Sequence, residues 1–577
     1  MNSVILLLVC AVGYVVAYRT YGRYLGRKIF SICTNHITPA NELQDNIDFV
    51  PTRREIVFGH HYASIAGTGP IVGPAIAVIW GWLPALIWIF FGSIFMGAVH
   101  DFGVLVLSLR NRGESIGEIS KRLINDRVRV LFSLVIFFTL WVVVAIFCMI
   151  MAVLFDMFPQ SVIPIWTQIP IAVAFGYSMR RFPNKITVMS IAAVAMMYIS
   201  IFIGSYYPLK MPAILGMSPL TAWTIILLIY TYAASVMPVW KLLQPRDFIN
   251  SYQLFIGLGM LCVGIFVSRA PIVAPAINLN PPGAPPIIPF LFVTVACGAI
   301  SGFHCMVSSG TTSKQLRTDK DALSVGYGAM LVEGIMAVMV LISVSAGLGM
   351  MLRTQSGEVL NGFCAWSHYY CDWAAVQGLG AKVGAFVKGS ANLLNSFGIP
   401  YTVGTTLMGV FVASFAGTTL DTATRIQRYI INELARESNI VPLKGRHGAT
   451  FVAVASAAIL ALSQGGGKGG LILWPLFGTS NQLLAGLALL TLTVYLIRQK
   501  IPCKVTFIPM LIIIFFTGWA MIYNITVFIA SGEWHLVFIG SIILLLEIWM
   551  IVETLIVYAN IRKNNLSESN GYSQENL

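Results

Sequence analysis

The chain alternates long apolar runs with short polar segments. Runs of roughly 17–25 residues match the length of a helix that crosses a bilayer. They lie near residues 3–18, 56–80, 84–108, 130–155, 162–178, 186–205, 220–238, 251–269, 289–310, 325–351, 399–419, 447–464, 471–496, 506–530 and 535–558. The pattern therefore predicts an all-α polytopic membrane protein with about 15 transmembrane helices.

Composition agrees with this pattern. Of the 577 residues, 57% are hydrophobic and only 10% are charged, and the mean hydropathy is +0.80. A soluble globular protein carries about 25% charged residues, so we expect the lipid bilayer to surround this chain. The formal net charge of +13 does not indicate nucleic acid as a partner, because the basic residues lie in short loops between apolar runs.

The basic residues also predict how the spans are oriented. If successive spans alternate in direction, one side collects the basic residues within 19–54, 110–129, 180–185, 241–246 and 314–320. The positive-inside rule makes that side cytoplasmic, with the N-terminus outside and the C-terminus inside. Residues 381–397 are moderately apolar, but counting them as a span would move the basic residues of 425–446 outside. We therefore expect an external amphipathic helix there.

Two of the apolar runs are interrupted by residues that end helices. In residues 58–74 (FGHHYASIAGTGPIVGP), glycines and prolines stand in the middle of a span. Residues 296–312 (ACGAISGFHCMVSSGTT) combine glycines, small polar residues and a histidine. Such a break persists in a bilayer only where protein or a watery cavity satisfies its backbone groups. Secondary transporters build midplane substrate sites from breaks of this kind.

The positions of the two breaks predict the domain organisation. The second broken span is the seventh span after the first, so the two cross the membrane in opposite directions, as in an inverted repeat. We predict one transmembrane domain over residues 1–563. Its repeats would cover about 56–205 and 289–496, with extra helices at 3–18, 220–269 and 506–558. The polar segment 564–577 is expected to be a disordered cytoplasmic tail.

Several motifs resemble those of the carbon starvation protein A family of bacterial inner-membrane transporters. They are residues 58–61 (FGHH), 67–74 (GTGPIVGP), 98–102 (AVHDF), 296–312, 421–425 (DTATR) and 473–478 (LWPLFG). The resemblance implies a five-plus-five inverted repeat of the amino acid–polyamine–organocation type in the cytoplasmic membrane. It also implies uptake of peptides or pyruvate during carbon starvation, with proton coupling.

The broken spans supply the candidate substrate-binding residues. Imidazole titrates near neutral pH and can relay a proton or meet a carboxylate, whereas small residues at a break can line a cavity. Interfacial histidines that cap a helix, and small residues that only pack helices closely, remain alternatives. The candidates are His60, His61, Gly67, Thr68, Gly69, Ser301, Gly302, His304, Ser308 and Ser309. We expect no metal or other cofactor, because neither an HExxH motif nor a tight His/Cys ligand spacing occurs.

Carboxylates in or beside the spans are candidates for ion coupling, because a charge inside a bilayer is costly. They are Asp101, Glu333 and Asp421, and the hydroxyls of Thr418 and Thr419 lie close to Asp421 in sequence. A proton is the expected coupling ion. An oxygen-rich sodium site at Asp421 is an alternative, and so is a simple pair between Asp421 and Arg425 at i+4.

Cys364 and Cys371 both fall in a loop that the topology places outside. In an oxidising compartment they could form a disulfide, although two free thiols are the alternative.

These features favour a secondary active transporter, not an enzyme, that takes up a small organic nutrient by alternating access. Sodium-coupled uptake of another nutrient is the first alternative. A channel would need a continuous ring of carbonyls or charges, and an intramembrane enzyme would need a converging catalytic group. The sequence does not separate peptide from pyruvate or predict an oligomeric state.

Overall fold

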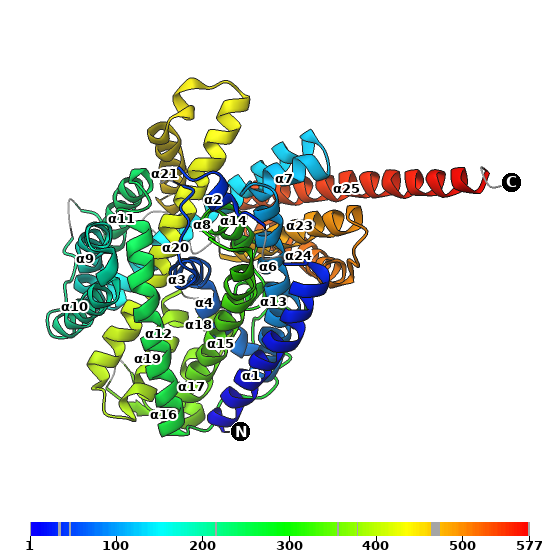
Figure 1. Ribbon diagram of the computed structural model, residues 1–577. Coiled ribbons are helices and arrows are strands. Elements are labelled where there is room, and N and C mark those ends of the chain that lie inside the picture. Colours follow the sequence, from blue (N-terminus) through cyan, green and yellow to red (C-terminus); the bar gives the residue numbers. More distant parts are fainter. Residues whose placement is uncertain are drawn as a thin grey trace.

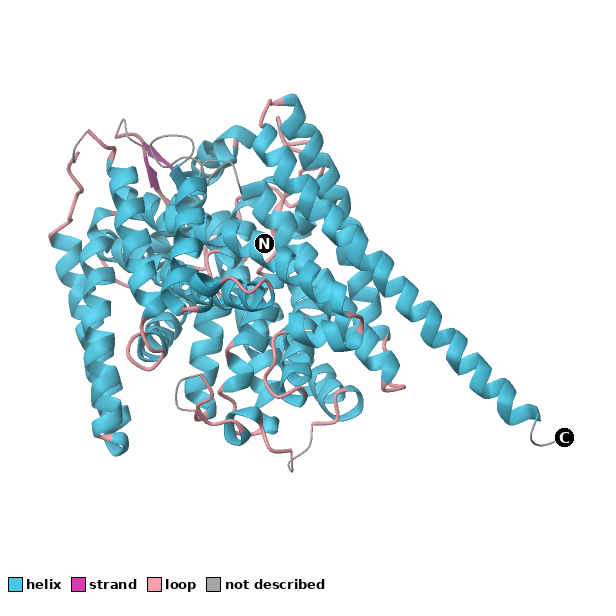
Figure 2. Cartoon of the chain, turned by 90° about the horizontal axis from the view of Figure 1, so that it is seen from above, coloured by secondary structure: helices cyan, strands magenta, loops and turns pink. Residues whose placement is uncertain are grey.

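Helices account for nearly all of the regular structure (Figures 1 and 2). The computed structural model describes residues 2–32, 36–45, 48–213, 216–354, 357–377, 379–462 and 474–574. In these ranges the strands are β1 (Leu352–Arg353) and β2 (Val359–Leu360), which pair antiparallel. The fold is therefore all-α, as the apolar pattern predicts.

The described part of the first half of the chain forms twelve α-helices. They are α1 (Ser3–Ala17), α2 (Pro39–Glu42), α3 (Arg54–Ile65), α4 (Gly69–Ala77), α5 (Trp82–Gly92), α6 (Ala98–Arg110), α7 (Ile116–Leu123), α8 (Asp126–Met157), α9 (Val162–Arg181), α10 (Ile186–Tyr206), α11 (Pro219–Val236) and α12 (Leu243–Ser268). A π-helical segment, Ser93–Gly97, joins α5 to α6 as one long helix.

The second half has the same character. Its helices are α13 (Ile287–Thr294), α14 (Gly302–Gly310), α15 (Ala329–Ile342), α16 (Leu348–Met350), α17 (Gly362–Tyr370), α18 (Trp373–Gln377), α19 (Leu379–Asn395), α20 (Tyr401–Glu437), α21 (Arg446–Leu462), α23 (Trp474–Arg498), α24 (Lys504–Ala530) and α25 (Trp534–Gln574). Residues 463–473, which the predicted spans 447–464 and 471–496 include in part, lie outside the described ranges.

Local sequence specifies where several of these helices begin. Ser115, Asn125 and Ser218 precede α7, α8 and α11, and each side chain accepts a hydrogen bond from a backbone N–H of the first turn. Such caps satisfy N–H groups that have no partner inside the helix. Pro219 then occupies the first turn of α11, where its missing N–H costs no helical bond.

The described residues contain 12 helices long and apolar enough to cross a membrane, or 13 if the bent pair formed by α3 and α4 is counted. Two further predicted spans are shorter here. Residues 289–310 are divided into α13 and α14, and α21 has 17 residues. The chain is thus a multi-pass membrane protein, and the count of about 15 spans stays a prediction. Most of the predicted external helix at residues 381–397 lies in α19 (Leu379–Asn395), which is not among the membrane-crossing candidates.

Both predicted interruptions are present, and they touch. The axes of α3 and the following helix differ by 46°. An added Cβ on Gly69 would overlap Cys297 Sγ, and one on Gly73 would lie 2.5 Å from the Thr294 carbonyl oxygen. Each break therefore packs against the other, at positions where only glycine leaves enough room.

The order of elements after each break is similar. The first break is followed by the long helix through α5 and α6, the short α7 and the long α8. The second is followed by the long helix through α15, the shorter α19 and the long α20. The long helices α8 and α20 pack against each other in the interior. This order fits the predicted inverted repeat, which stays a prediction.

The C-terminal helix α25 extends well beyond the bundle (Figure 1). Its described range runs to Gln574, within the polar segment 564–577, whose disorder stays a prediction. Helix propagation adds one backbone hydrogen bond per residue, so a polar segment can extend a helix that the preceding apolar span has already nucleated.

Candidate functional site

A cavity of about 360 Å³ lies between α3, α9, α12 and α20 and the segment after α14. Its charged lining residues are four cations and one carboxylate: Arg53, Arg180, Lys314, Arg425 and Asp48. His60, Gln244, Thr311, Gln315, Trp240 and Tyr429 also line it. We call this the polar cavity. Its lining carries an excess of positive charge, which favours an anion over a cation as an occupant.

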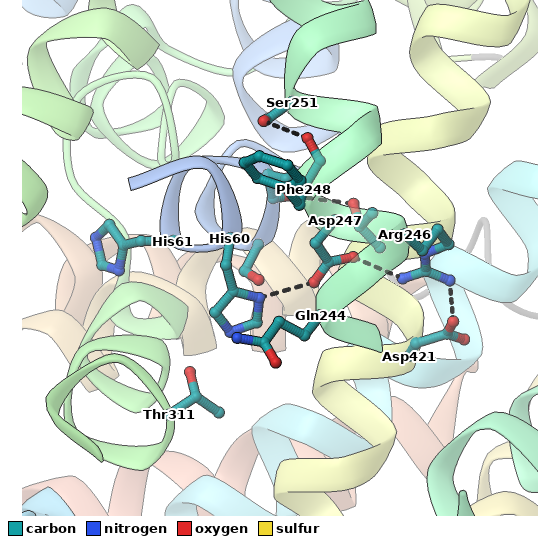
Figure 3. Close-up of polar contacts among 12 residues, drawn as sticks. His60, His61, Gln244, Arg246, Asp247, Phe248, Ser251, Thr311 and Asp421 are labelled. Carbon is teal, nitrogen blue, oxygen red and sulfur yellow. Dashed lines mark hydrogen bonds and ion pairs between the residues drawn. The ribbon is translucent and has the colours of Figure 1, made fainter. Parts of the chain in front are cut away.

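His60 connects the polar cavity to a buried chain of charges, which we call the His60 cluster (Figure 3). His60 Nδ1 lies 2.9 Å from Asp247 Oδ2. The other oxygen of Asp247 accepts a hydrogen bond of 3.1 Å from Arg246, which also pairs with Asp421. The Tyr230 hydroxyl donates to Asp421 over 2.8 Å. Buried charges need such partners, because desolvation of an isolated ion is very costly.

Three buried polar atoms in the cavity lining have no hydrogen-bond partner among the described residues. They are His60 Nε2, Gln315 Oε1 and Arg425 Nε. The side chains of His60 and Arg425 are 0% and 3% exposed. Native structures leave few such atoms unpaired, and those that remain require an explanation such as a bound molecule.

Lys314 contributes a further positive charge, held between aromatic rings. Its Nζ lies 5.4 Å from the ring centroid of Phe49 and 5.6 Å from that of Tyr429. The Tyr429 hydroxyl donates to Asp48, so that carboxylate is already engaged. Burial lowers the pKa of Lys314 below its ordinary value, and the nearby carboxylates of Asp48 and Asp45 oppose this shift. A bound anion would favour the charged form in the same way.

A second set of titratable side chains lies at the helix breaks, and we call it the Asp101 cluster. Both oxygens of Asp101 bind histidine: Oδ1 lies 2.8 Å from His100 Nδ1, and Oδ2 lies 2.8 Å from His304 Nδ1. His304 Nε2 is 3.5 Å from a carboxylate oxygen of Glu333. All four side chains are fully buried, and none of them lines the polar cavity.

His60 and His61 do not converge on one site, because neighbouring residues of a helix point about 100° apart (Figure 3). His61 Nδ1 lies 2.8 Å from the Thr312 hydroxyl. His61 is also within electrostatic reach of Asp101 and His304. The structure therefore separates the predicted histidines: His60 lines the cavity, whereas His61 lies nearer the Asp101 cluster.

The predicted small residues fill the breaks. Thr68 caps α4 through its backbone, and its buried hydroxyl has no hydrogen-bond partner among the described residues. Ser301 Oγ and the N–H of Phe303 both donate to Asn481 Oδ1, so an amide from α23 caps the start of α14. An added Cβ on Gly67 would lie 2.7 Å from Thr419 Oγ1, and one on Gly302 would overlap the Asn481 carbonyl oxygen.

Ser308 and Ser309 lie on α14 and are also buried. Ser309 Oγ donates to the Cys305 carbonyl and accepts from the N–H of Ile116, whereas Ser308 Oγ has no partner among the described residues. None of the predicted serines or glycines lines the polar cavity. That these serines and glycines bind substrate stays a prediction.

Thr418 and Thr419 provide hydrogen-bond donors to backbone carbonyls at the C-terminal end of α3. Their hydroxyls donate to the carbonyls of Ala63 and Ser64, over 2.9 and 3.4 Å. These carbonyls belong to the last turn of a helix and have no N–H partner further along it.

Asp421 pairs with Arg246 on another helix, so the simple i+4 pair with Arg425 is wrong. Arg425 and Arg428 instead donate to the carbonyls of Ala234, Ser235 and Met237, at the C-terminal end of α11. Cationic side chains stabilise a helix C-terminus by engaging carbonyls that the helix leaves free.

The predicted disulfide is absent, because Cys364 and Cys371 are both free and exposed. Cys364 lies in α17, and Cys371 directly follows the end of that helix. Seven residues along a helix separate two Cα atoms by about 10 Å, whereas a disulfide needs less than about 7 Å.

Sequence reasoning missed Tyr230, Arg246, Asp247, His100 and Asn481. The apolar run begins near residue 251, so the sequence places Arg246 in a cytoplasmic loop, but α12 begins at Leu243. A buried Arg–Asp pair at the edge of a span has the same sequence pattern as loop charges. His100 could have been found as the neighbour of Asp101.

Fold and site together define a polytopic membrane protein with ionisable groups deep in its helix bundle. A family model described as carbon starvation protein CstA matches residues 2–520. The peptide transporter CstA of Helicobacter pylori is 34% identical over 86% of this chain and 78% of that protein. The pyruvate/proton symporter BtsT of Escherichia coli is 32% identical over 88% of this chain and 80% of that protein. The peptide transporter CstA of Bacillus subtilis is 30% identical over 91% of each chain.

The chain therefore belongs to the carbon starvation protein CstA family. It is a membrane transporter and not an enzyme. Among solved structures, the crystal structure of MhsT in complex with L-phenylalanine aligns with a TM-score of 0.42 at 12% identity, over 88% of this chain and 98% of that chain.

Proposed function

We propose that this protein is a proton symporter that takes up small organic carboxylates, pyruvate or short peptides, across the bacterial cytoplasmic membrane during carbon starvation. The observation that carries the proposal is His60. It is a buried, titratable side chain that faces a cavity with a cationic lining. A proton and an organic anion can thus be bound next to each other, as symport requires.

The position of the cavity supports an inward-open state of the transport cycle. The cavity lies beside Arg53, Arg180 and Lys314, whose segments the positive-inside rule assigns to the cytoplasm. In this proposal the polar cavity opens to the cytoplasm, and the two helix breaks, which pack against each other, close the path to the outside. In this orientation the N-terminus is outside and the C-terminus is cytoplasmic. In the other state of the alternating-access cycle, the helix breaks would separate and the site would open to the outside.

A proton fits the site better than sodium as the coupling ion. A sodium site would need several free oxygen ligands near Asp421. Here Asp421 is paired with Arg246, and the Thr418 and Thr419 hydroxyls bond to carbonyls of α3. The titratable groups of the His60 and Asp101 clusters, including Glu333, remain candidates for proton binding.

The substrate class follows from the lining charges and from the relatives. Four cations against one carboxylate suit a carboxylate ligand, and a volume of about 360 Å³ is at the small end of typical ligand sites. The E. coli relative is named a pyruvate/proton symporter and the others peptide transporters. A dipeptide is the second candidate, because Asp48 lines the cavity and could meet its ammonium group in addition to the hydrogen bond that it accepts from Tyr429.

Uptake into proteoliposomes tests the proposal. Labelled pyruvate and a labelled dipeptide are presented with an inward proton gradient, an inward sodium gradient or no gradient. We expect accumulation with the proton gradient that a protonophore abolishes. Accumulation driven only by sodium would overturn proton coupling, and movement of neither solute would overturn this substrate class.

A further inference from the structure

The ring of His60 is held so that only one of its nitrogens can exchange a proton with the polar cavity. Nδ1 faces Asp247 Oδ2 at 2.9 Å, and a carboxylate can only accept, so Nδ1 carries the hydrogen. Nε2 is buried, has no partner among the described residues, and belongs to a side chain that lines the cavity. A proton added to neutral His60 therefore goes to Nε2, where it becomes a hydrogen-bond donor toward the cavity.

The charges around His60 can balance an imidazolium. From α12, Asp247 contacts the ring and Arg246 follows behind it, and from α20 come Asp421 and Arg425. Lys314 faces the same cavity from the turn after α14, whereas His304 of α14 and Glu333 of α15 belong to the Asp101 cluster. On α3 itself His61 points away (Figure 3). Within the His60 cluster, one guanidinium faces two carboxylates, so an imidazolium would neutralise the remaining charge.

Two cationic side chains in the cavity lining offer donors for an anion. Arg425 uses one terminal nitrogen to hold two carbonyls at the end of α11, and its buried Nε has no partner among the described residues. Lys314 Nζ lies beside two aromatic rings, and no described carboxylate is within ion-pair distance of it. Both groups are thus available to a carboxylate in the cavity, where low solvent access strengthens the interaction.

We propose that the polar cavity is a proton-linked carboxylate site, in which the Nε2–H of protonated His60, Lys314 and Arg425 bind the anion together. The proposal rests on the symport proposed above and identifies its coupling atom. Because the anion contacts the added proton directly, each ligand raises the affinity for the other by the same factor. Release of the carboxylate into the cytoplasm then promotes release of the proton from Nε2 to the same side.

Calorimetric titration of the purified full-length protein in lipid nanodiscs tests this link, with pyruvate as the probe. Titrations in buffers of different ionisation enthalpy give the number of protons bound with each pyruvate. We expect net proton uptake of up to about one per pyruvate, and an affinity that rises by up to about tenfold for each unit that the pH falls. Binding of pyruvate without proton uptake and without pH dependence in the wild-type protein would overturn the inference.

Substitutions identify the residue that takes up the proton when pyruvate binds. His60→Gln should remove the proton uptake and flatten the pH dependence, while His447→Gln, at an exposed histidine outside the cavity, should leave both unchanged. Lys314→Gln should weaken pyruvate binding about tenfold or more but retain the proton uptake. Its matched control is Lys320→Gln, at an exposed lysine outside the cavity, which should leave pyruvate binding unchanged.

The outcomes separate this inference from the proposed function. If proteoliposomes accumulate pyruvate with a proton gradient but His60→Gln still takes up a proton with pyruvate, the coupling atom is wrong and the symport stands. If the wild-type protein neither binds nor accumulates pyruvate or a dipeptide, the proposed function fails and the inference fails with it.

Discussion

The two histidine–carboxylate clusters contain the same chemical groups but differ in access. In the His60 cluster, a histidine links a buried carboxylate to a cavity with a cationic lining. In the Asp101 cluster, a carboxylate binds two histidines, and no member lines the polar cavity. Proton exchange requires a path as well as a titratable group. The difference in access supports our proposal that the His60 cluster exchanges protons with the polar cavity.

The clusters also differ in how their charge is balanced. Arg246 pairs with both Asp247 and Asp421 and permanently compensates one of their two charges, because a guanidinium stays protonated. Among the described residues, no arginine or lysine is paired with Asp101 or Glu333, and the ion-pair partners of these carboxylates are histidines. The net charge of the Asp101 cluster therefore depends on the protonation of its histidines and carboxylates. This property suits the proposed binding and release of a proton when the helix breaks open.

The largest expected effect comes from removing the fixed cation of the His60 cluster. Arg246→Gln leaves two buried carboxylates without compensation, and we expect the free energy of unfolding to fall by about 3–5 kcal/mol. Unfolding is measured in detergent by thermal denaturation. Arg246→Gln combined with Asp421→Asn should recover part of the loss. Equal stability of the single variant and the wild type would show that the pair does not hold the helices together.

Asp101→Asn tests the role of the Asp101 cluster. The amide keeps the shape of the carboxylate but weakens its two charge-assisted hydrogen bonds, so we expect a loss of about 1.5–3 kcal/mol in stability. Uptake driven by a proton gradient should fall more than about tenfold. Proton uptake on pyruvate binding, measured calorimetrically, should persist. Loss of that uptake would contradict the separation of the two clusters.

The two helix breaks pack tightly against each other, and Gly73→Ala tests this packing. The new methyl group would meet the Thr294 carbonyl, so we expect a stability loss of about 1–3 kcal/mol together with slower uptake. Gly518→Ala is the control, because nothing lies within 4 Å of its added Cβ. If the two variants unfold at the same temperature, close packing at the breaks is not limiting.

The smallest effect is expected from Thr418→Val. This change removes one hydroxyl that serves the Ala63 carbonyl, at a cost of about 1 kcal/mol. Proton-driven uptake should continue in sodium-free buffer for both variant and wild type. If uptake by the wild type requires sodium and this requirement disappears in Thr418→Val, the result would support the sodium alternative. Proton coupling alone would then not explain uptake.

The sequence could predict the elements and not their partners. Apolar run length identifies the spans, and the Gly–Pro cluster around Gly69 identifies a break, because both depend on local chemistry. The pairing of Asp421 with Arg246 depends on how α12 and α20 pack, whereas the local pattern favours Arg425 at i+4. His60 and His61 are adjacent in sequence, yet helix geometry directs them to different surroundings. The cavity itself has no sequence signal, since separate segments far apart in the chain line it.

The polar contacts of α20 have a consequence for changes in chain length. Thr418 contacts α3, Asp421 contacts α12, and Arg425 and Arg428 both contact α11. The spacing of these four positions places them along one stripe of the helix. Inserting or deleting a single residue before this stripe would rotate it by about 100° and remove all of these contacts at once. We therefore expect α20 to tolerate substitutions better than any insertion or deletion, whereas the projecting end of α25 should accept both.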